Sequence, residues 1–151
     1  MSSKREQVLD NLVTALTAIA TGGGYNFTIG EAKLGLKHFE QTPADKFPAA
    51  YVAGADEGRD NTTNRGFKSD LTISIVGYVR VQDAADTEQL ERDVSKFLED
   101  MTKAIMADPT RGGLATYTQI GQVKADKGAW VPYAGFEITV HCDYRATFAA
   151  P

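Results

Sequence analysis

The sequence predicts an α+β fold in which a mixed, mostly antiparallel sheet packs against two main helices, in the order α-β-β-β-α-β-β. Three observations support this fold: two stretches carry apolar residues at spacings of three and four, several others carry them at every second position, and turn residues separate the stretches. Because a chain of 151 residues with ordinary composition fits one domain, we expect a single domain over residues 1–151.

The stronger helix is predicted at Thr87–Ala107, preceded by Asp86 as N-cap. Gln89, three residues after this cap, can complete a capping box. Pro109 and the glycines at 112–113 end the helix and reverse the chain. Its apolar stripe, which should cover the sheet, consists of Leu90, Val94, Phe97, Leu98, Met101 and Ile105.

The opening helix is predicted at Glu6–Thr21 and ends at the triple glycine 22–24. These glycines could suggest a phosphate cradle, but they follow a helix and lack the Lys-Ser/Thr pair of a P-loop, so we interpret them as a flexible helix end. Tyr25–Ile29 alternates as a short strand. Glu31–Gln41 is a second strand or irregular, and Ala49–Gly54 is apolar enough for a buried strand.

Residues 55–68 form the longest polar stretch, with charges of both signs. We expect a long, mobile loop here, because loops of this length tend to be functional or mobile. Asp56, Glu57 and Asp60 could suggest a calcium loop, but the EF-hand spacing is absent. A loop that becomes ordered against a neighbouring subunit is the interpretation that we favour.

Three further strands are predicted, at Leu71–Val81, at Leu114–Val123 and, after a reversal at Lys124–Gly128, at Phe136–Phe148. The last one alternates most regularly and would span ~43 Å at ~3.3 Å per residue. A compact domain of this size is only roughly 38 Å across. The strand should therefore cross the whole domain and project from it, leaving unpaired backbone groups that another subunit could cover.

Few residues could carry chemistry. Cys142 and His141 are neighbours on a strand and point to opposite faces, so they cannot act as nucleophile and base. His38 has no companion, and two histidines with one cysteine leave no credible zinc site. We therefore expect no catalysis, no metal and no cofactor. The row Glu137, His141, Asp143 and Arg145 is either a solvated sheet face or a subunit contact.

Two other features have open interpretations. The segment Trp130-Val131-Pro132-Tyr133 could be an interface anchor or a corner of the core. Arg111 could bind a carboxylate or phosphate, but on a glycine turn we expect it to be exposed to solvent. The candidate subunit-interface residues are Asp56, Glu57, Arg59, Asp60, Arg65, Arg111, Glu137, His141, Asp143 and Arg145.

The bulk properties exclude some classes of protein. A net charge of −4 gives no sign of a nucleic-acid binder. A single cysteine permits no intrachain disulfide. The N-terminus lacks the apolar run of a signal peptide, and no segment approaches the ~20 apolar residues that span a bilayer. We expect a protein that is made and used without export or membrane contact.

The layout resembles the tail-terminator, or tail-completion, proteins of long-tailed bacteriophages. The residues that carry this resemblance are the turn at 107–115 (ADPTRGGLA), the strand ending ITVHCDYR at 138–145 and the final Pro151. The opening helix and the polar stretch 55–68 are also similar to this family. The resemblance covers nearly the whole chain in layout, although its motif marks a turn and not a reaction.

The resemblance implies a structural virion protein that forms a homo-oligomeric ring, commonly a hexamer. Such a ring caps the tail tube at its head-proximal end, stops tube polymerisation and offers a surface to the head-completion or connector protein. The implied partners are further copies of this chain, the tail-tube protein and the head-completion protein, with DNA only as passing cargo. Assembly would take place in the host cytoplasm.

A ring of identical subunits joins one surface patch to a different patch on the next subunit. We expect residues 55–68 to form one side of this contact and the face or edge of the last strand to form the other. Alternative functions are a neck or head-tail connector subunit and a tail-tube subunit. An enzymatic or small-molecule-binding α+β domain is a further alternative, but it requires a polar pocket with converging ionisable groups, and no such set is visible in the sequence.

Overall fold

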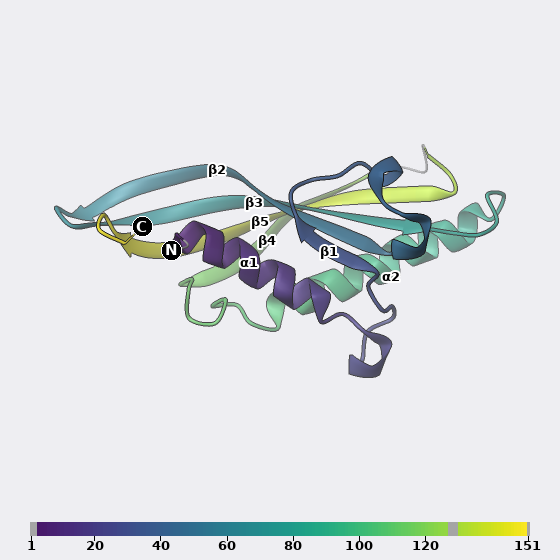
Figure 1. Ribbon diagram of the computed structural model, residues 1–151, viewed down its shortest axis with the longest axis horizontal. Helices are drawn as coiled ribbons and strands as arrows, with labels where there is room; N and C mark the ends of the chain where they lie inside the picture. The colour runs from purple at the N-terminus through teal and green to yellow at the C-terminus, as the bar shows by residue number, and fades with distance from the viewer. Residues whose placement is uncertain (1–2, 127–129, 151) are drawn as a thin grey trace.

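The computed structural model describes residues 3–126 and 130–150, so the final Pro151 lies outside it. The described residues form two α-helices and a five-stranded sheet (Figure 1). The elements are α1 (Lys4–Thr17), β1 (Glu31–Leu34), β2 (Ala49–Thr63), β3 (Gly66–Arg80), α2 (Thr87–Met106), β4 (Tyr117–Ala125) and β5 (Tyr133–Thr147). The strand order is β1-β2-β3-β5-β4, with β1 and β2 parallel and the other neighbours antiparallel. The predicted α+β fold is confirmed.

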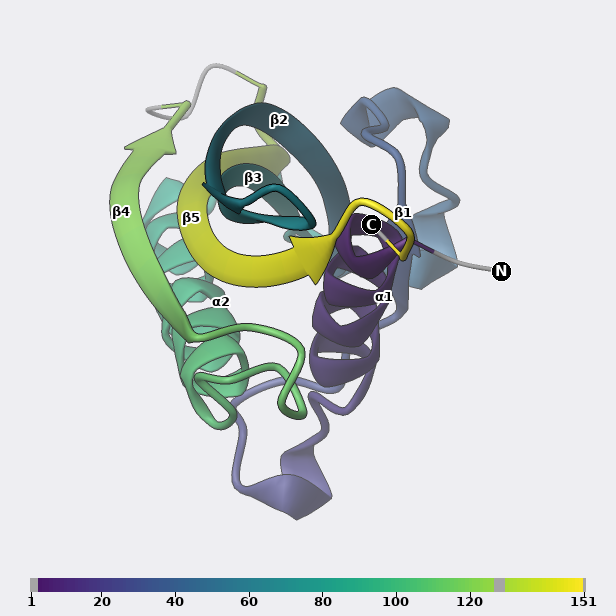
Figure 2. The ribbon, with the colours of Figure 1, turned by 90° about the vertical axis from the view of Figure 1, so that its left-hand side faces the viewer.

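Both helices lie against the same face of a strongly twisted sheet (Figure 2). The opening helix begins earlier than predicted because Ser3 caps it, accepting a hydrogen bond from the Glu6 amide at 3.2 Å. It ends at Thr17, before the glycines, which form a short 3-10 turn at Thr21–Gly23.

The short strand predicted at Tyr25–Ile29 is wrong. The Asp100 carboxylate, which is 2% exposed on α2, accepts hydrogen bonds from the Asn26 amide at 2.8 Å and the Phe27 amide at 2.9 Å. The Asn26 side chain donates to the same carboxylate at 3.1 Å. These backbone groups bind a helix side chain and are therefore not paired with a neighbouring strand. The ambiguous stretch that follows forms β1 at Glu31–Leu34 and is otherwise irregular.

Helix α2 matches its prediction closely. The Asp86 side chain accepts a hydrogen bond from the Gln89 amide at 3.0 Å. The Gln89 side chain does not bond back to the cap but donates to Asp93 at 2.7 Å. Gly77 of β3 allows close contact between helix and sheet, because a Cβ there would lie 2.9 Å from the Met101 sulfur.

The mobile loop predicted at 55–68 is also wrong. Strand β2 continues from Ala49 to Thr63, turns at residues 64–65 and returns as β3 from Gly66. This part of β2 is a strand because its backbone pairs with β3. Its side chains are exposed on both faces, so apolar and polar residues do not alternate as they do in a half-buried strand. A register shift between Gly54 and Glu57 marks where β2 leaves the body of the sheet.

The last strand is longer than predicted, spanning Tyr133–Thr147, and every residue of β3 pairs with it. Strand β4 at Tyr117–Ala125 begins three residues later than expected. Of the reversal predicted at Lys124–Gly128, residues 124 and 125 belong to β4, and residues 127–128 lie outside the described residues.

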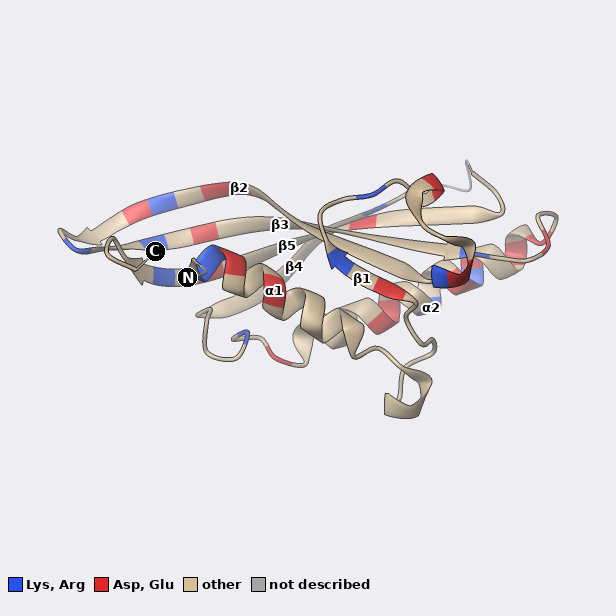
Figure 3. Ribbon diagram, viewed as in Figure 1, with Lys and Arg blue, Asp and Glu red and all other residues tan. Residues whose placement is uncertain are grey.

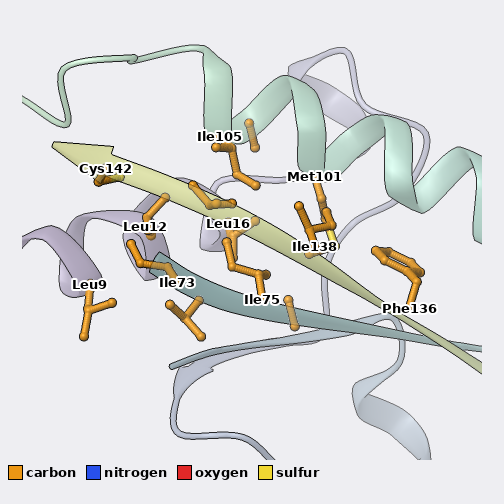
Figure 4. Close-up of a cluster of buried hydrophobic side chains, with 14 of the residues drawn as sticks. Leu9, Leu12, Leu16, Ile73, Ile75, Met101, Ile105, Phe136, Ile138 and Cys142 are labelled. Carbon is orange, nitrogen blue, oxygen red and sulfur yellow. The ribbon is translucent and has the colours of Figure 1, made fainter. Parts of the chain in front are cut away.

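The main core lies between the helices and the sheet (Figure 4). It joins Leu12 and Leu16 of α1 to Ile105 of α2, Ile75 of β3 and Ile138 of β5, all fully buried. Full burial of such a side chain stabilises the fold by about 1.5–3 kcal/mol. Cys142 is also fully buried in this core, as its place in the apolar row predicts.

A smaller aromatic cluster covers the opposite face of the sheet. Phe39 packs against Tyr78 and stacks on Tyr133 with ring centroids 4.8 Å apart. Trp130 contacts Phe39 at 5.4 Å but stays 47% exposed, so it combines features of both the core corner and the surface anchor. Within the described part of the chain, no helix is long and apolar enough to cross a membrane.

Replacing Asp100 with Ala should lower the free energy of unfolding by about 2–3 kcal/mol, because the amides of Asn26 and Phe27 would lose the partly buried charged acceptor of their hydrogen bonds. Urea denaturation followed by circular dichroism measures this loss. Glu99→Ala, at an exposed position of the same helix, is the matched control and should change stability by less than about 0.5 kcal/mol. Equal effects of the two substitutions would contradict this role of Asp100.

Candidate subunit interface

The most prominent surface feature is an arm of three strands, made of residues 57–63 of β2, 66–71 of β3 and 142–147 of β5. The β2–β3 hairpin of this arm extends past the start of α1 (Figure 1). The first turn of α1 contacts the arm toward its tip, where the Lys4 ammonium donates to the Arg145 carbonyl oxygen at 3.1 Å. The arm is thus an extension of the body and not a separate loop.

On the face of the arm next to α1, a polar network joins β2 to β5. The Tyr144 hydroxyl donates to the Glu57 carboxylate at 2.7 Å. Arg59 pairs with the other carboxylate oxygen, and Arg5 of α1 lies 3.9 Å from Glu57. The Arg59 guanidinium also lies 4.5 Å from the centre of the Phe67 ring, which is 1% exposed. These contacts allow a polar arm to bury an aromatic ring near its tip.

The network changes two ionisation equilibria. Burial opposes the charged form of Glu57, but the hydrogen bonds from Tyr144 and Arg59 outweigh it, so the pKa of Glu57 lies below its ordinary value. Burial, together with the hydrogen bond to Glu57, raises the pKa of Tyr144. Glu57 is therefore held as an anion that fastens the two outer strands of the arm to each other.

The opposite face of the arm carries a row of charges. Lys68 lies 3.9 Å from Asp143, which is 5% exposed, and His141 lies 3.9 Å from Asp70. A hydrogen bond to Asp143 raises the pKa of Tyr117. Asp70 and Asp143 are direct partners in the register, and like charges at such positions are unfavourable, so Lys68 and Tyr117 offset part of this repulsion.

Most of the candidate interface residues gather on or beside this arm. Glu57 and Arg59 lie on the face near α1, while Asp60 pairs in register with Lys68 on the opposite face. Arg65 is exposed in the hairpin turn. The remaining candidates on the sheet are Asp56, exposed at the register shift of β2, and Glu137, His141, Asp143 and Arg145 along the outer face of β5.

Residues 55–68 and the last strand, which we expect to form the two sides of the subunit contact, lie together on the arm. Strand β3 joins them, and the hydrogen bond between Tyr144 and Glu57 links them within one subunit. The pairing of these strands was not predicted, because residues 55–68 lack the alternation of apolar and polar residues that identifies a strand.

The exposure expected for Arg111 is wrong, because this residue is 0% exposed. Its guanidinium donates to the carbonyl oxygens of Ile105 and Asp108, with Arg111 Nε 2.7 Å from Asp108. The positive charge therefore stabilises the unpaired carbonyl oxygens at the C-terminal end of α2. Burial lowers the pKa of Arg111. The position of Arg111, four residues after the predicted end of the helix at Ala107, could have indicated that it caps this helix.

A cationic pocket at the tip of the arm was not predicted from the sequence. This pocket has a volume of about 490 Å³, and its lining includes Lys4, Arg65 and Arg145 but no acidic residue. The backbone places these residues together from three distant parts of the chain. Their separation in sequence explains why no local pattern indicated the pocket.

Among residues 3–126 and 130–150, no three histidine, cysteine or acidic side chains gather in a way that could hold a metal ion. The sequence matches no protein-family model and no curated protein. The arguments for function therefore depend on the chain's own sequence and structure.

The role of Glu57 predicts a pH dependence. A carboxyl group whose pKa is lowered by folding stabilises the protein above its unfolded pKa of ~4.3, and this contribution disappears as the pH falls through the lower folded pKa. Glu57→Gln should therefore reduce stability most at pH 7, and its difference from wild type should shrink below about pH 4.3. Thermal unfolding between pH 7 and pH 3 measures this. Asp56→Asn is the exposed control, and a Glu57→Gln difference that is independent of pH would contradict the prediction.

Proposed function

We propose that this chain is a structural subunit of a homo-oligomeric ring that caps the tail tube of a long-tailed bacteriophage. In this role the ring stops tube polymerisation and provides the surface that joins the head. The proposal combines the layout of the sequence with one structural observation, the projecting arm. It also implies a location at the head-proximal end of the tail and assembly in the host cytoplasm.

The arm supports assembly because one of its edges is open. Strand β1 pairs with β2 only through Ala49–Val52, so among the described residues Ala53–Thr63 have a neighbouring strand on one side only. An edge of this length usually needs protection from uncontrolled pairing. The charged residues Asp56, Arg59 and Asp60 provide such protection, and they also suit a specific contact with another subunit.

The arrangement favours a ring over a symmetric pair. The arm lies at one end of an elongated molecule (Figure 1), so it can contact a different surface on the next copy. Such a contact is heterologous and closes into a ring when its rotation permits. The expected partners at the two faces of the ring are the tail-tube protein and the head-completion protein. A chain with net charge −4 suits DNA that passes through and is not retained.

The purified protein should form closed rings of one size, with six subunits as the expected number. Size-exclusion chromatography with light scattering gives the mass, and negative-stain electron microscopy gives the shape. Long filaments would instead indicate a tail-tube subunit. A monomer at every accessible concentration would contradict the proposal.

Shortening the arm should abolish ring formation without unfolding the body. Because Arg59 faces Ser69 in the register, Asn-Gly can replace residues 60–68 as a two-residue turn. This variant should retain its helical circular dichroism signal, because both helices lie outside the deletion and Phe67 is the one residue of the main core that it removes. Asn64→Asp, which keeps the length of the arm, is the control and should still form rings. Rings of unchanged size from the shortened variant would exclude the arm as a subunit contact.

A further inference from the structure

The end of the molecule opposite the arm tip carries a groove of about 440 Å³. It lies between the first turns of α2 and the end of β4 with the start of β5. Leu90 and Val94 contribute apolar side chains from α2, and Glu91 and Asp126 contribute carboxylates. A volume of this size is within the range of sites that accept a large side chain.

The surroundings of this groove are acidic. From Asp83 to Asp93 the sequence contains Asp83, Asp86, Glu88, Glu91 and Asp93 against the single cation Arg92, which pairs with Glu88. Figure 3 shows acidic segments at the start of α2 and basic segments at the tip of the hairpin, at opposite ends of the molecule. The two ends are thus complementary in charge.

The arm tip also offers an apolar group of suitable size. Phe148 is 52% exposed and lies with its ring centre 5.5 Å from that of Phe67. Its amide donates to the Arg65 carbonyl oxygen at 2.8 Å, which keeps it beside the cationic pocket. An exposed aromatic residue beside arginines is the combination that most often dominates binding energy at protein interfaces.

We propose that the arm tip of one copy docks into the acidic groove of the next copy, with Phe148 packed against the groove wall that Leu90 and Val94 form and with Arg65 and Arg145 facing the carboxylates. This inference rests on the proposed ring and names its contact surfaces. Because tip and groove lie at opposite ends of the molecule, the contact is heterologous and leaves neither patch unused in a closed ring.

Charge exchange tests this docking directly. The groove variant Glu88→Lys/Glu91→Lys reverses Glu91 in the groove lining and Glu88 beside it. This variant and the tip variant Arg65→Glu/Arg145→Glu should each fail to assemble alone, with apparent dissociation constants raised about a hundredfold or more. Mixed in equal amounts, the two variants should form rings of normal size, because every tip then meets a groove of opposite charge. Mass and shape are measured by light scattering and negative-stain microscopy.

Two further variants complete the experiment. Asp10→Lys/Glu99→Lys changes two exposed acidic residues outside the groove by the same total charge and should assemble normally, which separates docking from net charge. Phe148→Ala should weaken assembly although it changes no charge. Circular dichroism melting of each variant verifies that it is folded.

The outcomes distinguish this inference from the proposed function. Wild-type rings together with tip or groove variants that assemble normally would overturn the docking contact and leave the ring intact. Failure of the mixed variants to assemble would also overturn it. If the tip variant forms rings but loses affinity for a short fluorescent DNA duplex, the cationic pocket serves nucleic acid and not a second copy. A wild-type chain that is always monomeric would overturn both the ring and the contact.

Discussion

The antiparallel pairing of β3 with β5 is the interaction on which the rest of the structure depends. All fifteen residues of β3, from Gly66 to Arg80, are paired with β5. At ~3.3 Å per residue these strands are roughly 50 Å long, which exceeds the diameter expected for a compact domain of this size. A continuous ladder of this length must therefore extend beyond the helices that cover it, and the arm is its consequence.

The same ladder determines what each face of the molecule can do. Side chains alternate between the two faces of the sheet. The face that carries Ile73, Ile75 and Ile138 is the one on which both helices pack. In the arm, the same face of the sheet extends beyond the helices. The polar network of Glu57, Arg59 and Tyr144 covers it there in place of apolar helix side chains. The arm thus keeps its shape through polar contacts while its edge stays open to another molecule.

Charge is distributed along this long axis, and not only between the faces. Basic residues gather at the arm tip, and acidic residues gather where β3 leads into α2. A chain of modest net charge can therefore still carry a cationic pocket at one end and a group of carboxylates at the other. The net charge of −4 gives no indication of this separation.

The sequence by itself determined the parts of the fold whose apolar residues repeat regularly. The stripe of α2, the cap Asp86 and the alternation of β5 were predicted because each depends on neighbours close in the chain. The same reasoning failed at residues 55–68, where strand formation depends on pairing with β3 and the side chains carry no alternation. It also failed at Tyr25–Ile29, where Asp100, distant in the chain, binds the backbone.

Of the candidate site, the charged row on β5 was predicted by strand alternation alone. Only the tertiary structure decided that Arg111 is buried at the end of α2, that Glu57 bonds to Tyr144, and that Lys4, Arg65 and Arg145 line one pocket. The physical reason is the same in each case. These contacts join residues whose separation in sequence carries no periodic signal, and they exist only because the backbone pairing of three long strands brings them together.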